Sequence, residues 1–485
     1  MRFARPAPVD RRLAGTGPLG NGGDQEPGVT GLGEKFNRRV KHRTVDTRVT
    51  GSAKIYYHYE TQSNISRVTE AAAHPVRLED LAQPRFSAEA QQILDMMAAM
   101  APQYPLDAGA LHAQASADTG LHDFGPQGVH DYRERLDVYL TAVREIDGLH
   151  AAGVVNFYGQ LLQLLKNRLL LTDLLSRHPE IDDIELEPPI VIAGLPRTGT
   201  THLHNLLAAP PTFRTMPYWE SVEPFPLPQE IGIQPDPRRT RMDIAVGVIN
   251  TVMPQFALMH EMTTDHVHEE IQLLANDVST MLFETLADVP RWRVYYQAHD
   301  QTPHYEYLAR QLKAMQFLRG GRRWLLKSPQ HLEQVPVLDR VFPDSIVVFT
   351  HRDPVPVALS MIAMITYSAR MHRAPVPMEQ IAESWIDRLD QMLTALIRDR
   401  DTIGPDRSVD IRFDDFMADE LGSAERVYAL AGEPFTGEAR MAIAGYLSGH
   451  RRGRLGNVET SYEMFGLKED DLRARFAPYV DRFLT

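Results

Sequence analysis

The sequence predicts an α/β fold in which helices flank a parallel β-sheet, with an N-terminal helical segment and a helical lid insertion. The first observation is a set of four short runs that indicate strands, with helical stretches between them: 189–194, 323–327, 345–351 and 408–413. Most are apolar on both faces, which is typical of a parallel sheet covered on both sides, whereas the last alternates and fits an edge strand. The second observation is that Arg197, Lys327 and Arg352 come at or just past three strand ends. Ligands of such sheets bind at those ends.

The chain before the first strand divides into two parts. Residues 1–65 are rich in Gly, Pro, Arg and Thr without sustained periodicity, which indicates a disordered arm. A misplaced gene start would explain them equally well. From 66 to 185 the pattern is helical, and Val154 to Arg177 has the spacing of a long amphipathic helix. Its buried side is expected to carry Leu161, Leu164, Leu165 and Leu169. We expect this helical segment to pack against the α/β core.

Composition narrows the class of protein. The 485 residues carry a net charge of −13, which argues against nucleic-acid binding, since that depends on a surplus of Lys and Arg. The absence of Cys excludes disulfides, thiolate metal sites and a Cys nucleophile. The most apolar stretch, Val154 to Leu175, has too many polar residues for a membrane span, and the N-terminus lacks the apolar region of a secretory signal. We therefore expect a cytoplasmic protein.

A phosphate-binding loop is predicted at 194–201. The sequence Gly-Leu-Pro-Arg-Thr-Gly-Thr-Thr follows the apolar run 190–193 and precedes leucines at helical spacing. In a strand, Gly-rich turn and helix, backbone N–H groups and the helix dipole point at an anion. The frame is that of a nucleotide P-loop, except that Thr200 replaces the usual Lys and the positive charge has moved to Arg197. The P-loop-like sheet therefore carries a loop that lacks the usual Lys. This argues against an ordinary ATPase or kinase and for a different phosphorylated donor.

Three further stretches carry basic residues. The strand at 345–351 ends in Arg352-Asp-Pro, and the helix after it carries Ser360, eight residues after Arg352. A guanidinium gives a phosphate two parallel donors, and a hydroxyl gives a third. Lys327 ends another strand, and a basic, Gly-containing stretch near the C-terminus includes Arg452 and Gly453.

Together these four stretches resemble sulfotransferases that use 3′-phosphoadenosine 5′-phosphosulfate (PAPS). The resemblance covers roughly residues 185–480 and is closest to the broad bacterial group with tyrosylprotein-sulfotransferase-like motifs. His202 stands where the cytosolic phenol and steroid enzymes have a Trp. The resemblance implies that the 5′-phosphosulfate is bound by Arg197, Thr198, Gly199, Thr200 and Thr201. It implies that Arg352 and Ser360 bind the 3′-phosphate and that Arg452 and Gly453 close over it. It also implies that Lys327 contacts the sulfuryl group, and that the reaction uses no metal.

The catalytic base is the least determined part of the predicted site. In-line transfer of the sulfuryl group to a hydroxyl or amine of an unidentified acceptor needs fixed positive charge, for which Arg197 and Lys327 are suited. It also needs a base in reach of the acceptor's proton. We predict Glu220, because tyrosylprotein and heparan sulfotransferases are similar in placing a Glu after this helix. His331 is the alternative, because cytosolic sulfotransferases use a His shortly after their Lys. The remaining alternatives are His204 and the group His260, Glu261, His266, His268, Glu269 and Glu270.

That last group also suggests a metal site. His266 and His268, two residues apart, would not share a helical face, and PAPS chemistry needs no metal. We therefore expect no metal.

Residues 186–485 are expected to form the sulfotransferase-like domain, with an acceptor-site insertion at 210–320. Its Pro-rich turns give way to helical patterns that contain Met253, Met259, Trp292, Tyr295, Tyr296 and Tyr305. Loops and helices above the crevice are where specificity for the acceptor is built. Such residues favour a small apolar acceptor, although each suits ordinary core packing equally well. The sequence leaves the identity of the acceptor and the oligomeric state open.

Two other functions stay open. A P-loop kinase or NTPase would need a Lys at position 200 and an Asp that holds Mg²⁺ at a strand end. Thr200 fails the first condition, and Asp353 has Arg352 beside it, which suits an anion better. A catalytically inactive protein that binds PAP, the desulfated donor product, would keep the fold. The presence of both Lys327 and Ser360 beside the two arginines argues against such decay.

Overall fold

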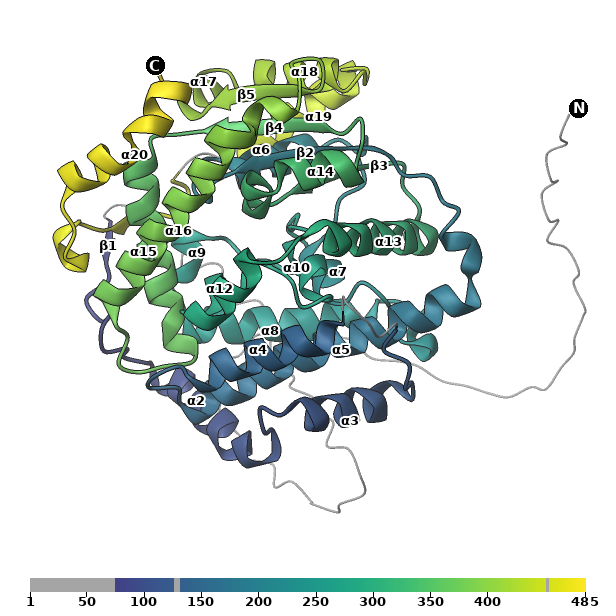
Figure 1. The fold of residues 1–485 in the computed structure, drawn as a ribbon, viewed down its shortest axis with the longest axis vertical. Helices are drawn as coiled ribbons and strands as arrows, with labels where there is room; N and C mark the ends of the chain where they lie inside the picture. Colours follow the sequence, from purple (N-terminus) through teal and green to yellow (C-terminus); the bar gives the residue numbers. More distant parts are fainter. Residues whose placement is uncertain (1–74, 126–130, 451–452) are drawn as a thin grey trace, which may run out of the picture. The chain divides into compact units, whose positions relative to one another are not determined.

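The four predicted strands form one parallel sheet. The computed structural model describes residues 75–125, 131–450 and 453–485, so the predicted arm at 1–65 lies outside the described residues. The strands are β2 (Glu187–Gly194), β3 (Arg323–Lys327), β4 (Ile346–His351) and β5 (Ser408–Arg412). They lie in the order β3-β2-β4-β5 and all run parallel, which confirms the predicted fold class and makes β5 an edge strand (Figure 1).

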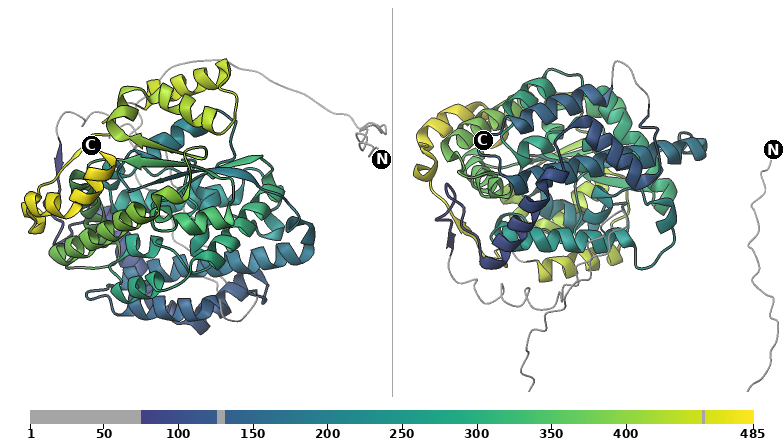
Figure 2. Two further views of the ribbon diagram at one scale, coloured as in Figure 1. Left: turned by 45° about the horizontal axis from the view of Figure 1, so that its top comes forward. Right: turned by 90° about the horizontal axis from the view of Figure 1, so that it is seen from below.

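Helices cover both faces of this sheet. They are α6 (Thr200–Ala208), α14 (Val335–Val341), α15 (Pro354–Ser368), α16 (Met378–Asp399), α17 (Phe413–Ala418), α18 (Glu420–Leu430), α19 (Gly437–Gly449) and α20 (Glu469–Phe483). Ile190 and Ile192 of β2 pack with residues of α6, α18 and α19. Val191 and Ala193 point to the opposite face and join the larger core with α15 and α16. The left view of Figure 2 shows the yellow-green helices α18 and α19 on one side of the sheet.

The N-terminal segment is helical, as the periodicity predicts. Its helices are α2 (Ala88–Met100), α3 (Ala108–Thr119), α4 (Tyr132–Arg144) and α5 (Ala151–Arg177). The side chains of Ser87, Asp107 and Asp131 accept hydrogen bonds from first-turn N–H groups and so begin α2, α3 and α4. The four leucines expected on the inner side of α5 are all buried.

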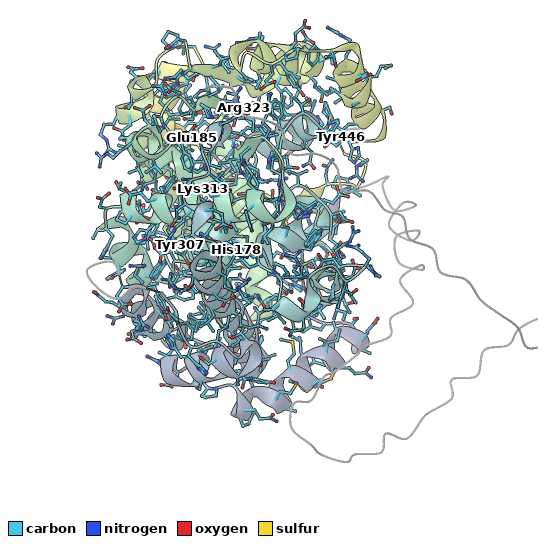
Figure 3. The ribbon with its side chains drawn as sticks, turned by 90° about the vertical axis from the view of Figure 1, so that its right-hand side faces the viewer. His178, Glu185, Tyr307, Lys313, Arg323 and Tyr446 are labelled. Atoms are coloured by element: carbon cyan, nitrogen blue, oxygen red, sulfur yellow. The ribbon has the colours of Figure 1, made fainter. Side chains whose placement is uncertain are left out.

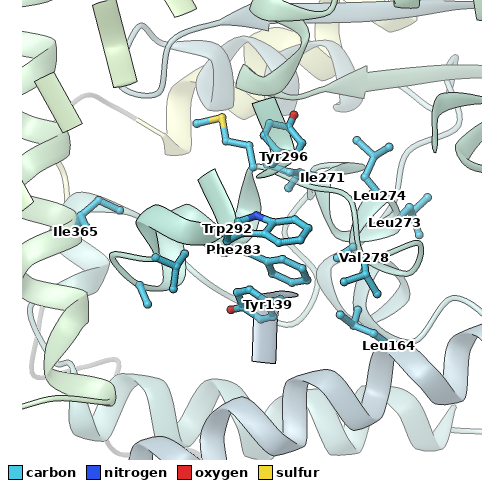
Figure 4. Packing of buried hydrophobic residues seen from close by; sticks show 14 of the residues in the cluster. Tyr139, Leu164, Ile271, Leu273, Leu274, Val278, Phe283, Trp292, Tyr296 and Ile365 are labelled. Atoms are coloured by element: carbon cyan, nitrogen blue, oxygen red, sulfur yellow. The ribbon is translucent and has the colours of Figure 1, made fainter. Parts of the chain in front are cut away.

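The insertion consists mainly of helices, of which α8 and α13 are the longest. They are α7 (Tyr218–Val222), α8 (Pro237–Val252), α9 (Phe256–Met259), α10 (Ile271–Ala275), α11 (Leu282–Leu286), α12 (Pro290–Gln297) and α13 (Thr302–Arg319). An aromatic cluster joins the insertion to the N-terminal segment (Figure 4). Tyr139 of α4 stacks on Phe283 with ring centroids 3.9 Å apart and meets the edge of Trp292 at 5.6 Å. Trp292 therefore serves the core and not an acceptor pocket.

Two contacts join distant parts of the chain. Lys313 of α13 donates a hydrogen bond to the carbonyl of Asp182 at 2.8 Å, close to the end of α5, and Figure 3 shows Lys313 and His178 on one side of the molecule. The short strand β1 (Val76–Arg77) pairs in parallel with β6 (Val458–Glu459), near the C-terminal basic stretch. Within the described ranges, no helix is both long and apolar enough to cross a membrane.

Candidate functional site

The loop after β2 is held in shape by its own residues and by the neighbouring strand. Gly194 pairs with Thr350 of β4, and a Cβ on Gly194 would lie 1.9 Å from the Thr350 hydroxyl oxygen. The hydroxyl of Thr198 lies 2.7 Å from the Leu195 carbonyl oxygen and 2.8 Å from the Thr350 hydroxyl oxygen. Arg197 and Gly199 both have positive φ, at 72° and 87°. The loop therefore turns sharply and leads directly into α6.

A cavity of about 790 Å³ opens above this loop, at the carboxyl ends of β2 and β4. Its walls come from the loop, α6, the 257–267 stretch, α15, α17, α19 and the 453–460 stretch. The sequence-predicted residues that line it are Arg197, Gly199, Thr200, Thr201, Arg352, Ser360 and Gly453. Thr198 is buried beneath the loop, and Arg452 lies outside the described residues. The structure thus brings most of the predicted donor site to one cavity.

The two predicted arginines and the predicted serine are in direct contact. Arg197 Nε donates to Ser360 Oγ at 3.0 Å, and Arg352 Nη1 donates to the Arg197 carbonyl oxygen at 2.6 Å. The guanidinium of Arg352 also lies over the ring of Phe413, 4.1 Å from its centroid. Burial, together with the positive charge of Arg352, lowers the pKa of Arg197. An anion in this cavity would offset both charges, so the arrangement suits a phosphate.

Lys327 lies beside the loop at the end of β3. Its side chain is 2% exposed, and Nζ lies 3.3 Å from the hydroxyl oxygen of Thr201 while also pairing with Glu269. The backbone N–H of Lys327 donates to Glu270 Oε2 at 2.8 Å. Two adjacent carboxylates therefore hold one lysine, one through its side chain and the other through its backbone.

Glu220, the predicted base, is not brought to the cavity. Its carboxylate is 1% exposed and pairs with Arg214 and Arg319, each at 2.6 Å. Glu220 lies in α7 of the insertion, and its two arginines come from sequence positions on either side of this helix. The position of Glu220 after the loop helix does not indicate that Arg214 and Arg319 pair with it, so the sequence pattern did not predict these partners.

His331, the alternative base, is also enclosed away from the cavity. Its Nε2 donates to Glu270 Oε1 at 2.5 Å, and its Nδ1 accepts from the Tyr305 hydroxyl at 2.8 Å. Burial raises the pKa of Glu270, but hydrogen bonds from His331 and from the Lys327 N–H lower it on balance. Glu270 is therefore an anion that positions both His331 and Lys327.

The other candidate bases are buried or line the cavity, except for Glu269, which is half-buried and pairs with Lys327. His204, His268 and Glu270 are buried. His260, Glu261 and His266 line the cavity. Of the Met and aromatic residues expected at the acceptor site, Met259 lines the cavity, whereas Met253, Trp292, Tyr296 and Tyr305 are buried in the core. Core packing explains the latter four, because the helices of the insertion must bury their own apolar sides.

Some cavity residues were not singled out from the sequence as binding residues. Phe413 and Met417 of α17 and Tyr446 of α19 form one wall. His202 lines the same region and donates from Nε2 to Glu420 Oε1 at 2.6 Å. No motif marks the three residues of α17 and α19, because they follow the last strand of the sheet and reach the cavity only through the fold.

The part of the chain that the structure describes contains no group of three or more His, Cys, Asp or Glu side chains arranged to hold a metal ion. His266 and His268 instead contact each other, with Nε2 and Nδ1 2.8 Å apart.

The fold and the site define a class of protein, and comparison with known families names that class. The model of the sulfotransferase family matches residues 188–437, just over half of the chain. The chain belongs to the sulfotransferase family. The match begins at β2 and includes the loop, Lys327, Arg352 and Ser360.

Named relatives come from mycobacteria. Over 255 residues the chain is 25% identical to omega-hydroxy-beta-dihydromenaquinone-9 sulfotransferase Stf3 of Mycobacterium bovis, and equally to that of Mycobacterium tuberculosis strain CDC 1551. The match covers 51% of this chain and 63% of each relative, which is under two thirds of their length.

Solved sulfotransferase structures share the fold over a larger part of the chain. STF1 of Mycobacterium tuberculosis H37Rv superposes with a TM-score of 0.67 at 28% identity, over 77% of this chain and 98% of that one. STF9 of Mycobacterium avium gives a TM-score of 0.68 at 24% identity, over 78% and 97% of the two chains.

Proposed function

We propose that this protein transfers a sulfuryl group from PAPS to a hydroxyl group of a small, apolar acceptor. The observation that carries the proposal is the contact of Arg197, Arg352 and Ser360 with one another at a single cavity beside a Gly-rich loop. Two guanidinium groups and the start of α6 supply positive charge for an anion with two separate phosphate groups. Gly194 lets Thr350 pack directly against the loop, since a Cβ there would strike the Thr350 hydroxyl.

The residues divide between the two ends of the donor. Arg197, Gly199 and the N–H groups of Thr198, Thr200 and Thr201 are proposed to hold the 5′-phosphosulfate. Arg352, Ser360, Arg452 and Gly453 are proposed for the 3′-phosphate. Lys327 is proposed to meet the charge that develops on the bridging oxygen, because its ammonium lies beside Thr201.

The walls of the cavity support an apolar acceptor. Ala257, Leu258 and Val267 line it from the insertion, and Ala363 lines it from α15. The relative Stf3 is named for an omega-hydroxy menaquinone derivative, which carries a hydroxyl on a small molecule. We propose the same general chemistry for this chain: a hydroxyl group on an apolar body.

The two alternative functions, a kinase or NTPase and an inactive PAP-binding protein, differ in how much support they retain. A kinase or NTPase is disfavoured, because the chain belongs to the sulfotransferase family and has Thr200 in place of the P-loop Lys. An inactive PAP-binding protein would show PAP affinity without turnover of PAPS, and an assay of turnover separates the two.

Calorimetry with PAP in the absence of Mg²⁺ tests the donor site. We expect the wild type to bind PAP and Arg352→Ala to bind it roughly 10- to 1,000-fold more weakly, which is on the order of losing one or two charged hydrogen bonds. Arg412→Ala is the matched control, because Arg412 also ends a strand but contacts the Thr485 carbonyl outside the cavity. Binding of ATP with Mg²⁺ but not of PAP would contradict the proposal.

A further inference from the structure

One stretch of the insertion, residues 259–270, touches both cations that flank the proposed transfer point. At one end the Met259 carbonyl oxygen accepts a hydrogen bond from the Arg197 guanidinium. At the other end Glu269 pairs with the Lys327 ammonium, and Glu270 holds the backbone N–H of Lys327. Both ends of this stretch are therefore held against the two residues proposed to meet the charge of the donor.

Three histidines in this stretch differ in what their rings contact. His268 is buried, while His260 and His266 line the cavity. Both nitrogens of His266 are engaged, with Nδ1 2.7 Å from the Thr263 carbonyl oxygen and Nε2 2.8 Å from His268 Nδ1. His260 meets the ring of His266 at 6.3 Å and that of Phe256 at 5.9 Å between centroids, and among the described residues its imidazole makes no hydrogen bond. His260 thus lines the cavity with both ring nitrogens unbonded among the described residues.

The surroundings of His260 keep its ring neutral. Burial lowers its pKa well below the ordinary value, and the charges of Lys327, His266 and Arg197 lower it further. A neutral imidazole has the lone pair that a base requires. An anionic donor bound against Arg197 and Lys327 would offset their charges and so make His260 more basic at the moment when the base is needed.

The carboxylates in the same region are already committed to cations. Glu261 pairs with Arg454, and Asp265 pairs with Arg239. Glu269 pairs with Lys327 itself. Each of these carboxylates already has a cation as its partner, whereas the His260 ring lines the cavity without a hydrogen bond among the described residues, which makes it the group best placed to take a proton.

We infer that His260 is the general base that takes the proton from the acceptor hydroxyl, an assignment that rests on the proposed sulfotransferase function. The O–H proton moves to an imidazole nitrogen, and the acceptor oxygen forms a bond to sulfur. The bond between sulfur and the phosphate oxygen breaks, and PAP leaves with that electron pair. Lys327 and Arg197 meet the charge on the departing oxygen, and His260 then releases its proton to solvent.

The variant His260→Gln tests this assignment, with His299→Gln as the matched control because His299 is exposed outside the cavity. PAP affinity is measured by calorimetry, and PAPS consumption is measured as PAP release with 2-naphthol as the acceptor probe and with water alone. We expect His260→Gln to bind PAP within about threefold of the wild type and to consume PAPS roughly 10²- to 10⁴-fold more slowly. His299→Gln should match the wild type in both measurements.

The pH profile separates a base from a residue that only supports the structure. A base must be neutral, so turnover by the wild type should fall as the pH drops through the pKa of His260 in the donor complex. That acid limb should be absent from the residual activity of His260→Gln. The defect should also shrink with 4-nitrophenol, whose more acidic hydroxyl needs less help to ionise.

The outcomes of these experiments distinguish the role of His260 from the proposed sulfotransferase function on which it rests. Turnover by His260→Gln within threefold of the wild type, or a loss confined to PAP affinity, would overturn the role of His260 and leave the sulfotransferase function in place. A wild type that binds no PAP, or that binds PAP yet consumes no PAPS with either acceptor, would overturn both.

Discussion

At the scale of single residues, the loop depends on two positions with special backbone requirements. Gly194 accepts no side chain, because the Thr350 hydroxyl occupies the place where its Cβ would be. Arg197 adopts a φ of 72°, a left-handed conformation that costs a non-glycine residue on the order of 1–2 kcal/mol. Its bonds to Ser360 and to the Met259 carbonyl hold it there. The strain is thus offset by contacts that aim the guanidinium along the cavity wall.

Gly194→Ala should destabilise the protein by about 1–3 kcal/mol, the usual cost of overpacking, and should weaken PAP binding. Gly247→Ala is the matched control, since Gly247 lies exposed within α8 and a Cβ there meets nothing within 4 Å. The control should be neutral or stabilising by up to about 1 kcal/mol, because Ala favours a helix over Gly. Urea unfolding and PAP calorimetry measure both effects. Equal stability of Gly194→Ala and wild type would show that β4 moves aside readily.

At the scale of elements, a buried carboxylate joins the N-terminal helices to the insertion. Asp277, just after α10, contacts Arg135 of α4 at 3.0 Å, Arg168 of α5 at 2.6 Å and His304 of α13 at 2.6 Å. Burial raises the pKa of Asp277, but the hydrogen bond from His304 and the charges of the arginines lower it on balance. Four helical elements therefore meet at one negative charge.

Asp277→Asn should lower the free energy of unfolding by about 3–5 kcal/mol, because it leaves two buried arginines without their counter-charge. Asp182→Asn is the control, since Asp182 pairs with Arg310 at the surface, where both side chains are more than 40% exposed. Such a pair contributes at most about 1 kcal/mol. Denaturant titration of the two variants measures the difference. A similar loss in both would mean that the N-terminal helices dock without the buried charge.

At the scale of the whole molecule, several histidines are buried without charge. Burial, aided by nearby cations, lowers the pKa of His204 and of His372 to about 3. Both would titrate near 6.5 in the unfolded chain. As the pH falls below 6.5, each of these histidines binds a proton in the unfolded chain but not in the folded protein. The free energy of unfolding therefore decreases progressively between about pH 6.5 and pH 3.

The free energy of unfolding should therefore fall between pH 7 and pH 5, by roughly 2 kcal/mol for each such histidine. Urea unfolding at the two pH values measures the change. His372→Gln should lose part of this pH dependence, whereas His299→Gln, at an exposed position, should retain all of it. Identical unfolding curves of the wild type at both pH values would contradict the prediction.

The sequence by itself determined the features that are local in the chain. Apolar runs marked the three inner strands, because a strand buried on both faces has few polar residues. Glycines marked the loop, because Gly194 leaves room for Thr350 and Gly199 adopts a positive φ. The positions of Arg197, Lys327 and Arg352 at strand ends followed from the parallel sheet.

The tertiary structure decided which side chains meet. Glu220 and His331 occupy positions that suit a base, but distant partners, Arg319 and Tyr305 among them, enclose both away from the cavity. His260 was one of several alternatives in the sequence, and the proposal selects it because residues 259–270 fold between Arg197 and Lys327. Burial and the field of neighbouring charges depend on residues far apart in sequence, so proton-transfer roles emerge only from the assembled fold.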